Sequence, residues 1–321
     1  MKILVTGACG FIGFSFISHV LKASPNIKVI GIDNINDYYS VKLKKDRLSK
    51  LKRSKNFLFY KIDICDKNIL NKLFKNNKID CIYHFAAQAG VRYSIDHPRK
   101  YIDSNVLGHF NILEIIKNFK IKKLIYASSS SVYGDQVQFP LKENLQLEPK
   151  NTYALSKLFD EKISSIYANT YNLKIIGLRF FTVFGEWGRP DMFIMKYLKS
   201  IFFKEKFELY NYGNHYRDFT YIGDVVNILY KLMKKPVKKN HSVFNICSNK
   251  PIKITKVIKI INELVKQKAA IKLLPMQRAD IKKTHGHNAL IKKFIGVNKF
   301  EDIELSIRKT VSWYKKYYVK S

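Results

Sequence analysis

With 321 residues, 46% of them hydrophobic, the chain is long enough for one large domain or two unequal ones around a sizeable core. Its 58 Lys and Arg residues outnumber 25 Asp and Glu, and the net charge of +33 favours polyanionic ligands, but the scattered lysines lack the aromatic alternation of a nucleic-acid-binding surface, so we expect no nucleic-acid partner. No apolar stretch approaches the ~20 residues that span a bilayer, and four cysteines without C-x-x-C spacing indicate no disulfide framework, so we expect a cytoplasmic protein with no membrane partner.

The first residues carry the motif around which the chain is organised. The apolar run Lys2–Val5 predicts a buried strand, and glycines follow at three-residue spacing as Gly7, Gly10 and Gly13. Apolar residues then recur at helical spacing. In this strand–glycine–helix order, the first glycine permits a tight turn, the second lets the main chain approach a pyrophosphate, and the third allows close helix–strand packing. An ordinary glycine-containing loop is the alternative.

An acidic residue closes the second predicted strand. Val29–Asp33 is apolar up to Asp33, which lies 20 residues after Gly13. A carboxylate at this distance can accept hydrogen bonds from both hydroxyls of an adenosine ribose, and it repels a 2′-phosphate. The pattern therefore favours NAD over NADP, with a turn or helix-capping Asp as the alternative.

Further apolar runs alternate with helical segments. Phe57–Ile62 is closed by Asp63, an acid placed to meet an adenine amino group. Ile79–Phe85 is followed by two alanines, whose small side chains let a dinucleotide pack against the main chain. Pro98–Phe119 has the apolar spacing of a helix, and Lys123–Ala127 is a fifth strand. This alternation predicts an α/β fold with a doubly wound parallel sheet of the Rossmann type.

Polar residues follow the fifth strand. Ser128–Ser131 stands at the carboxyl end of a central strand, the edge at which such sheets bind ligands. Tyr153 and Lys157 come four residues apart in a helical segment, so their side chains share one face. Taken singly, these features read as a polar loop and a solvated helix face. Together with a dinucleotide fold, they predict a catalytic constellation.

These features together resemble the extended short-chain dehydrogenase/reductase family. The shared motifs are G-x-x-G-x-x-G at 7–13, Ser129, and Y-x-x-x-K at 153–157. Later segments are similar to the UDP-glucuronate 4-epimerase branch, and the match runs in order from residue 1 to about 300. Those segments are DNINDYY at 33–39, QAGVRYS at 88–94, RFFTVFG at 179–185, WGRPDM at 187–192 and YGNHYRDFTYI at 212–222.

The resemblance implies NAD-dependent C4 epimerisation of a UDP-sugar, from UDP-glucuronate to UDP-galacturonate through a transient 4-keto intermediate. Tyr153 is then the general base, and Lys157 lowers the pKa of its phenol from an ordinary value of about 10. Lys157 also bonds the nicotinamide ribose, and Ser129 hydrogen-bonds the 4-hydroxyl and relays its proton. Because the cofactor is regenerated in each turnover, the family implies tightly bound NAD.

Two serines stand where related enzymes carry acids. Sugar-nucleotide dehydratases place Asp-Glu after the catalytic hydroxyl, and related decarboxylases carry a Glu at the second of those positions. This chain has Ser130 and Ser131 there. Neither serine is a usable acid or base at neutral pH, so the resemblance favours redox at C4 without elimination or decarboxylation.

The resemblance also assigns binding residues and no metal. The cofactor set is Gly7, Gly10, Phe11, Ile12, Gly13, Asp33, Asn34, Asp63, Ile64, Ala86, Ala87 and Lys157. The sugar-nucleotide set is Arg92, Ser130, Ser131, Thr182, Arg189, Arg217, Arg278 and Asp280. Arg189 is the expected partner of a C6 carboxylate, which a guanidinium can bind through two hydrogen bonds, and a loop-to-helix ion pair is the alternative. Arg217 and Arg278 are expected at the diphosphate, with Asp280 near the uridine ribose.

Domain organisation follows the same resemblance. We expect an NAD-binding domain over 1–181 and a smaller, partly interleaved α/β substrate domain over 182–321, with returns to the first near 220–230 and 243–246. Family members pair through a four-helix bundle, which implies a homodimer through helices 98–119 and 152–171. The sequence His-Gly-His at 285–287 departs from the family's Tyr-Ala-Asp, whose Asp caps a helix, so we expect a weaker cap.

Two other functions stay open. One is C4 epimerisation of a neutral UDP-hexose or UDP-N-acetylhexosamine, for which Arg189 is the discriminating residue. The other is a non-catalytic NAD-sensing or nucleic-acid-binding protein. The intact set of Ser129, Tyr153 and Lys157 argues against a purely regulatory role.

Overall fold

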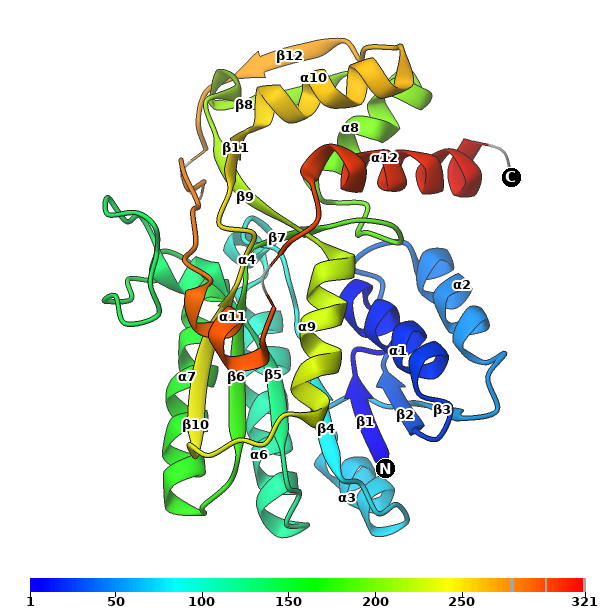
Figure 1. Ribbon diagram of the computed structural model, residues 1–321, viewed down its shortest axis with the longest axis vertical. Helices are drawn as coiled ribbons and strands as arrows, with labels where there is room; N and C mark the ends of the chain where they lie inside the picture. The colour runs from blue at the N-terminus through cyan, green and yellow to red at the C-terminus, as the bar shows by residue number, and fades with distance from the viewer. Residues whose placement is uncertain (278–279, 298, 320–321) are drawn as a thin grey trace.

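The computed structural model describes residues 1–277, 280–297 and 299–319. A seven-stranded sheet forms its centre, in the order β10-β6-β5-β4-β1-β2-β3, and all neighbouring strands are parallel (Figure 1). The strands are β1 (Lys2–Thr6), β2 (Lys28–Asp33), β3 (Phe57–Lys61), β4 (Cys81–His84), β5 (Leu124–Ser129), β6 (Ile175–Phe180) and β10 (His241–Ile246). The predicted doubly wound, Rossmann-type sheet is confirmed.

Helices cover both faces of this sheet, which is why its strands are apolar on both sides. One apolar core forms against α1 (Phe11–Ala23), α2 (Val41–Leu51), α9 (Ile222–Lys234) and α11 (Ala289–Ile295). The other forms against α3 (Lys67–Lys75), α6 (Gly108–Asn118) and α7 (Thr152–Thr170). The reversal of strand order falls where β1 lies between β2 and β4, and such switch points carry the ligand sites of α/β sheets.

The chain is helical from Pro98 to Asn118, close to the predicted range of 98–119, but a π-helical segment lies within it. The chain forms α4 (Tyr93–Asp96) and α5 (Pro98–Tyr101), then a π-helical segment over Ile102–Leu107, and only then α6. Apolar spacing alone does not reveal a π-helical turn, because such a turn changes the hydrogen-bond pattern while the chain remains helical.

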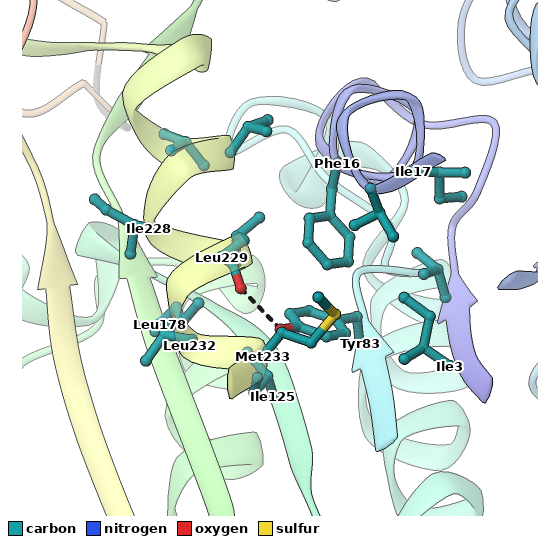
Figure 2. Packing of buried hydrophobic residues seen from close by; sticks show 14 of the residues in the cluster. Ile3, Phe16, Ile17, Tyr83, Ile125, Leu178, Ile228, Leu229, Leu232 and Met233 are labelled. Atoms are coloured by element: carbon teal, nitrogen blue, oxygen red, sulfur yellow. Dashed lines mark hydrogen bonds between the residues drawn. The ribbon is translucent and has the colours of Figure 1, made fainter. Parts of the chain in front are cut away.

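Figure 2 shows the packing of α1 and α9 on the sheet. Phe16 of α1 lies against Tyr83 of β4, with ring centroids 4.2 Å apart. The Tyr83 hydroxyl donates a hydrogen bond of 2.8 Å to the main-chain oxygen of Leu229 on α9. A strand from the first hundred residues is therefore tied to a helix beyond residue 220.

The C-terminal part lies above the carboxyl ends of the central strands (Figure 1). It holds a three-stranded sheet, β11-β9-β7, and a two-stranded sheet, β12-β8. Its elements are β7 (Thr182–Phe184), α8 (Phe193–Phe202), β8 (Phe207–Tyr210), β9 (Tyr216–Tyr221), β11 (Pro251–Lys253), α10 (Ile254–Val265), β12 (Ile271–Leu274) and α12 (Ile303–Tyr314). Between them, β10 returns to the central sheet beside β6, so the two parts interleave. The exact division at 181/182 stays a prediction.

Two smaller points complete the fold. α11 begins at Ala289, and the side chain of its N-cap residue Asn288 makes no capping hydrogen bond, in line with the weaker cap expected from His-Gly-His at 285–287. Among the residues that the structure describes, no helix is long and apolar enough to cross a bilayer.

Candidate active site

A cavity of about 420 Å³ opens at the carboxyl ends of β1, β2, β4 and β5, where the central sheet meets the C-terminal part. The residues predicted for the cofactor, the catalytic centre and the sugar nucleotide line it together, with two exceptions. Arg92 is not in its wall, and Arg278 lies outside the described residues. Sequence reasoning missed other lining residues, among them Tyr38, Lys44 and Gln88.

The glycine loop between β1 and α1 is a close-packed cradle. Gly7 has φ of 67°, and a Cβ added to it would lie 2.8 Å from the Ala86 nitrogen. A Cβ on Gly13 would lie 2.2 Å from the Gly7 carbonyl oxygen, so only glycine lets α1 sit this close to the loop. No side chain caps α1 at Gly10, which leaves the first N–H groups of the helix for an anionic ligand. This loop fits the pyrophosphate of NAD.

Asp33 ends β2 at the rim of this cradle. Its Oδ2 accepts a hydrogen bond of 2.9 Å from the Cys9 N–H, and its Oδ1 accepts one of 2.7 Å from the Ile35 N–H. Burial raises the pKa of Asp33, against the effect of these two bonds. Each oxygen retains a lone pair, so the carboxylate can still accept bonds from a ribose in the cavity.

Asp63 and Asn34 form a second polar pair on the same side. Asn34 Nδ2 donates to Asp63 Oδ2 at 2.9 Å, and the Cys65 N–H donates to Asp63 Oδ1 at 2.9 Å. Burial opposes ionisation of Asp63, but these bonds outweigh it and lower the pKa. The Asp63 carboxylate is thereby held as a hydrogen-bond acceptor in the wall of the cavity.

Ser129 is the last residue of β5, and the chain turns there into a short 3₁₀ helix over Ser130–Tyr133. Its Oγ accepts a bond from the Ser131 N–H and donates one to Ser131 Oγ, both at 3.1 Å. The hydroxyl therefore sits at a strand terminus with a fixed orientation, facing the cavity.

Tyr153 and Lys157 lie one turn apart on α7. Asn151 caps this helix by accepting a bond of 2.9 Å from the Ala154 N–H. Lys157 is buried, and its Nζ donates to Asp160 Oδ2 at 3.0 Å. Burial raises the pKa of Asp160 to about 7, against the opposing charge of Lys157. The sequence prediction missed Asp160, although its i,i+3 spacing from Lys157 is a usable signal.

Arg189 lines the cavity and forms an ion pair with Asp191. Its Nε donates to Asp191 Oδ1 at 3.0 Å, and its Nη2 donates to Asp191 Oδ2. Burial acts to raise the pKa of Asp191, but the Arg189 guanidinium outweighs it and lowers the pKa. Tyr38 lies beneath the pair, 5.6 Å from its ring centroid to the guanidinium carbon, and its hydroxyl donates to Asp191 at 3.3 Å. Among the residues that the structure describes, Nη1 of Arg189 makes no hydrogen bond and can serve another acceptor.

The far end of the cavity holds Arg217 and Asp280. Arg217 Nη1 donates to the main-chain oxygens of Tyr216 and Lys282 at 3.0 and 3.2 Å, and burial lowers its pKa to about 10. Arg92 reaches Asp280 from outside, with Nη2–Oδ2 at 3.0 Å. The predicted residues Arg92 and Asp280 are thus brought together, but as partners of each other.

Comparisons with known proteins agree with this site. Residues 3–247 match the model of the NAD dependent epimerase/dehydratase family. A UDP-glucuronate 4-epimerase of Thermodesulfobacterium geofontis is 39% identical over 314 residues, which cover 97% of this chain and 95% of the relative. The crystal structure of UDP-glucuronic acid 4-epimerase from Bacillus cereus, in complex with UDP-glucuronic acid and NAD, matches with a TM-score of 0.93 and 29% identity over 99% of this chain and 100% of that one. UDP-N-acetylglucosamine 4-epimerase from Methanobrevibacter ruminantium, in complex with UDP-N-acetylmuramic acid, matches with a TM-score of 0.88 and 28% identity over 98% of both chains.

The family match covers more than half of the chain, and it includes the glycine loop, Ser129, Tyr153 and Lys157. The predicted resemblance and the predicted NAD cofactor are both confirmed. The chain belongs to the NAD-dependent epimerase/dehydratase family, in the UDP-glucuronate 4-epimerase branch of the extended short-chain dehydrogenases/reductases.

Proposed function

We propose that this enzyme, an NAD-dependent 4-epimerase of UDP-sugars, interconverts UDP-glucuronate and UDP-galacturonate. The observation that carries the proposal is the single cavity that joins the glycine loop, the catalytic set and Arg189. NAD would be held at its pyrophosphate by the N–H groups of the glycine loop and at its adenosine ribose by Asp33. Bound NAD⁺ would supply the redox chemistry, as a hydride acceptor for C4 of the sugar that can give the hydride back to the opposite face.

The proton chemistry falls to the chain's own residues. Tyr153 removes the proton of the 4-hydroxyl, and Ser129, oriented by Ser131, hydrogen-bonds that hydroxyl and relays the proton. Lys157 lies one helical turn from Tyr153, and its buried ammonium, held by Asp160, would bond the nicotinamide ribose. Once the 4-keto sugar has turned over and been reduced on its opposite face, the same residues return the proton to the 4-oxygen and restore the hydroxyl.

Arg189 supports the choice of an acidic sugar. Its Nε and Nη2 are engaged by Asp191, and Nη1 can bind a carboxylate at C6. A neutral UDP-hexose or UDP-N-acetylhexosamine is the second candidate, and the existing Arg189–Asp191 pair favours it, because an ion pair already satisfies the guanidinium. Arg189→Ala separates the two: UDP-glucuronate turnover that is unchanged, with UDP-glucose also used, contradicts the acidic substrate.

The decisive experiment needs no added cofactor. The purified protein is incubated with UDP-glucuronate alone, and the sugar is followed by NMR. We expect UDP-galacturonate to appear, because NAD that is regenerated in each turnover stays with the protein. Failure of the signal to appear, with or without added NAD, contradicts the proposed reaction.

Tyr153→Phe tests the assigned base. Loss of a general base lowers the rate by about 10²–10⁴-fold, so turnover should fall below detection while NAD remains bound, as measured by its absorbance after gel filtration. Appreciable residual epimerisation means that another group removes the proton. A salt-dependent mobility shift with DNA tests the non-catalytic alternative.

We also propose that the enzyme is a cytoplasmic homodimer through the helices over 98–119 and 152–171. In the described residues all four cysteines are free thiols, as in a reducing compartment. Large apolar side chains lie exposed along these two neighbouring helical segments, and sedimentation of Phe159→Glu against wild type tests the interface. The exposed set is Ile102, Leu107, Phe110, Leu155, Phe159 and Ile166.

A further inference from the structure

Arg47 on α2 is a fully buried cation whose hydrogen-bond partners in the described residues are all neutral groups. Its Nη1 donates to the Cys9 carbonyl at 2.8 Å and to the Tyr39 hydroxyl at 2.7 Å. Its Nη2 donates to the Trp187 carbonyl and, at 3.4 Å, to the Gly188 carbonyl. Within the described part of the chain, its Nε has no hydrogen-bond partner. A guanidinium buried without a carboxylate is costly, so these main-chain contacts call for a reason.

The contacts of Arg47 join two loops that serve different ligands. Cys9 lies in the glycine loop, and its N–H donates to Asp33, the candidate ribose acceptor. Trp187 and Gly188 immediately precede Arg189 in the chain. Hydrogen bonds therefore run from the Asp33 carboxylate through Cys9 and Arg47 to the segment that carries Arg189. Arg47 itself does not line the cavity.

The second loop needs this support because its turn is strained. Trp187 has φ of 61°, in the left-handed region that bulky residues avoid. Its ring is packed between Phe14 of α1, at 5.1 Å, and Trp313 of α12, at 5.2 Å. Tyr317 lies 5.0 Å from it on the C-terminal side. Aromatic packing fixes the side chain, and Arg47 fixes the carbonyl, so the direction in which Arg189 leaves the turn depends on both.

We infer that Arg47 is a positioning residue that couples the glycine loop to the loop of Trp187, Gly188 and Arg189. Retention of the cofactor and recognition of the sugar's acidic group then both depend on Arg47. The inference rests on the proposed function for the identity of the acidic group alone. The physical coupling between the two loops is a property of the fold.

Arg47→Lys is the central variant. It keeps the charge, but one ammonium group cannot reach the acceptors on both loops that the planar guanidinium spans. We expect KM for UDP-glucuronate to rise about tenfold with kcat within about threefold, and NAD to dissociate about tenfold faster, as measured by displacement. Lys50→Met is the matched control, because Lys50 lies on the same helix with its ammonium 5.4 Å from the Trp187 ring. In the described residues the Lys50 ammonium makes no hydrogen bond to the main chain of either loop. The control should change each value less than about twofold.

A readout independent of any sugar uses the two tryptophans of the chain. Trp313→Phe leaves Trp187 as the single emitter. In that background, Arg47→Lys should raise acrylamide quenching about twofold, because the Trp187 turn is released. Unchanged quenching together with unchanged NAD dissociation overturns the inference. If both change while the wild type does not convert UDP-glucuronate, the proposed substrate is wrong and the coupling stands.

Reciprocal linkage provides a test that keeps Arg47 in place, should Arg47→Lys not fold. In the Tyr153→Phe protein, UDP-glucuronate should lower the Kd for NAD about fivefold more than UDP-glucose does, because coupling between two binding free energies acts equally in both directions. Equal lowering of this Kd by the two nucleotides overturns the inference. If UDP-glucuronate does not bind at all, the proposed substrate fails, and the quenching of Trp187 with and without NAD then decides the coupling. NAD that leaves this quenching unchanged overturns it.

Discussion

Glu161 and Arg179 form a buried ion pair behind the candidate active site, and breaking it has a calculable effect. Their side chains are 5% and 4% exposed. Arg179 donates from Nε to Oε1 at 2.9 Å and from Nη2 to Oε2 at 2.7 Å, and the Ser128 hydroxyl donates to Oε1 at 2.5 Å. Glu161→Gln keeps the shape of the side chain and removes its charge. The Arg179 guanidinium is then buried without a counter-ion.

Removing one partner of a buried ion pair costs about 3–5 kcal/mol of unfolding free energy. An unfolding entropy of about 2.1 cal/mol/K per residue gives roughly 0.7 kcal/mol/K for the 321 residues of this chain. The melting temperature of the Glu161→Gln protein should therefore fall by about 4–7 °C, as followed by circular dichroism at a fixed scan rate.

The matched control makes the same substitution in an exposed pair. Lys259 and Glu263 lie 3.9 Å apart on α10 with side chains 77% and 64% exposed. Such pairs contribute below about 1 kcal/mol, so Glu263→Gln should lower the melting temperature by less than about 1.5 °C. A decrease in the Glu161→Gln protein no larger than in this control would refute the reasoning, because the buried guanidinium would then be satisfied without Glu161.

Three further outcomes are expected. Gly13→Ala should release NAD while far-ultraviolet circular dichroism stays near wild type, since its Cβ would lie 2.2 Å from the Gly7 oxygen and displace α1; retained NAD contradicts the cradle. Asp33→Ala should weaken NAD binding by about tenfold or more and leave UDP binding unchanged in calorimetry, because a charge-assisted bond to the ribose is lost. Burial lowers the pKa of His84 to about 3 in the folded protein. As pH decreases, the imidazole of the unfolded chain therefore takes up a proton before that of the folded protein does. Stability falls as pH decreases from 6.5 towards 3. That loss is about 1.4 kcal/mol per pH unit for this group, and urea unfolding of His84→Gln should show a correspondingly shallower pH dependence below pH 6.5.

The sequence predicted the central sheet well because its strands are buried on both faces and therefore stand out as apolar runs. The predicted runs at 29–33, 57–62 and 123–127 differ from β2, β3 and β5 by one or two residues at their ends. The residues that line the cofactor side of the cavity could also be predicted from the sequence, since the glycine spacing and Asp33 are local signals. Each of these features depends on a short stretch of chain and can be interpreted without knowledge of the rest of the fold.

The hydrogen-bond and ion-pair partners of the buried cations could not be predicted from the sequence in this way. Arg47 lies in a polar, lysine-rich segment, yet its side chain is fully buried. Its burial depends on Trp187, which is 140 residues away in sequence. Asp160 and Asp191 are near their partners in the chain, but helical or loop spacing alone does not say which of several acids a buried cation will choose. The tertiary packing around the cation determines which acid becomes its partner.

The choice of partners bears on how an acidic sugar is recognised. Arg189 is already neutralised by Asp191, so a substrate carboxylate does not meet an isolated cation in the cavity. A neutral sugar would leave this ion pair as it is. A C6 carboxylate would bind the Arg189 guanidinium through Nη1, but it would also be repelled by the Asp191 carboxylate. Binding is then favourable only where Arg189 is held in the right orientation. If the enzyme takes an acidic sugar as proposed, we expect discrimination against neutral sugars to depend both on Arg189 and on the turn at Trp187 that orients it.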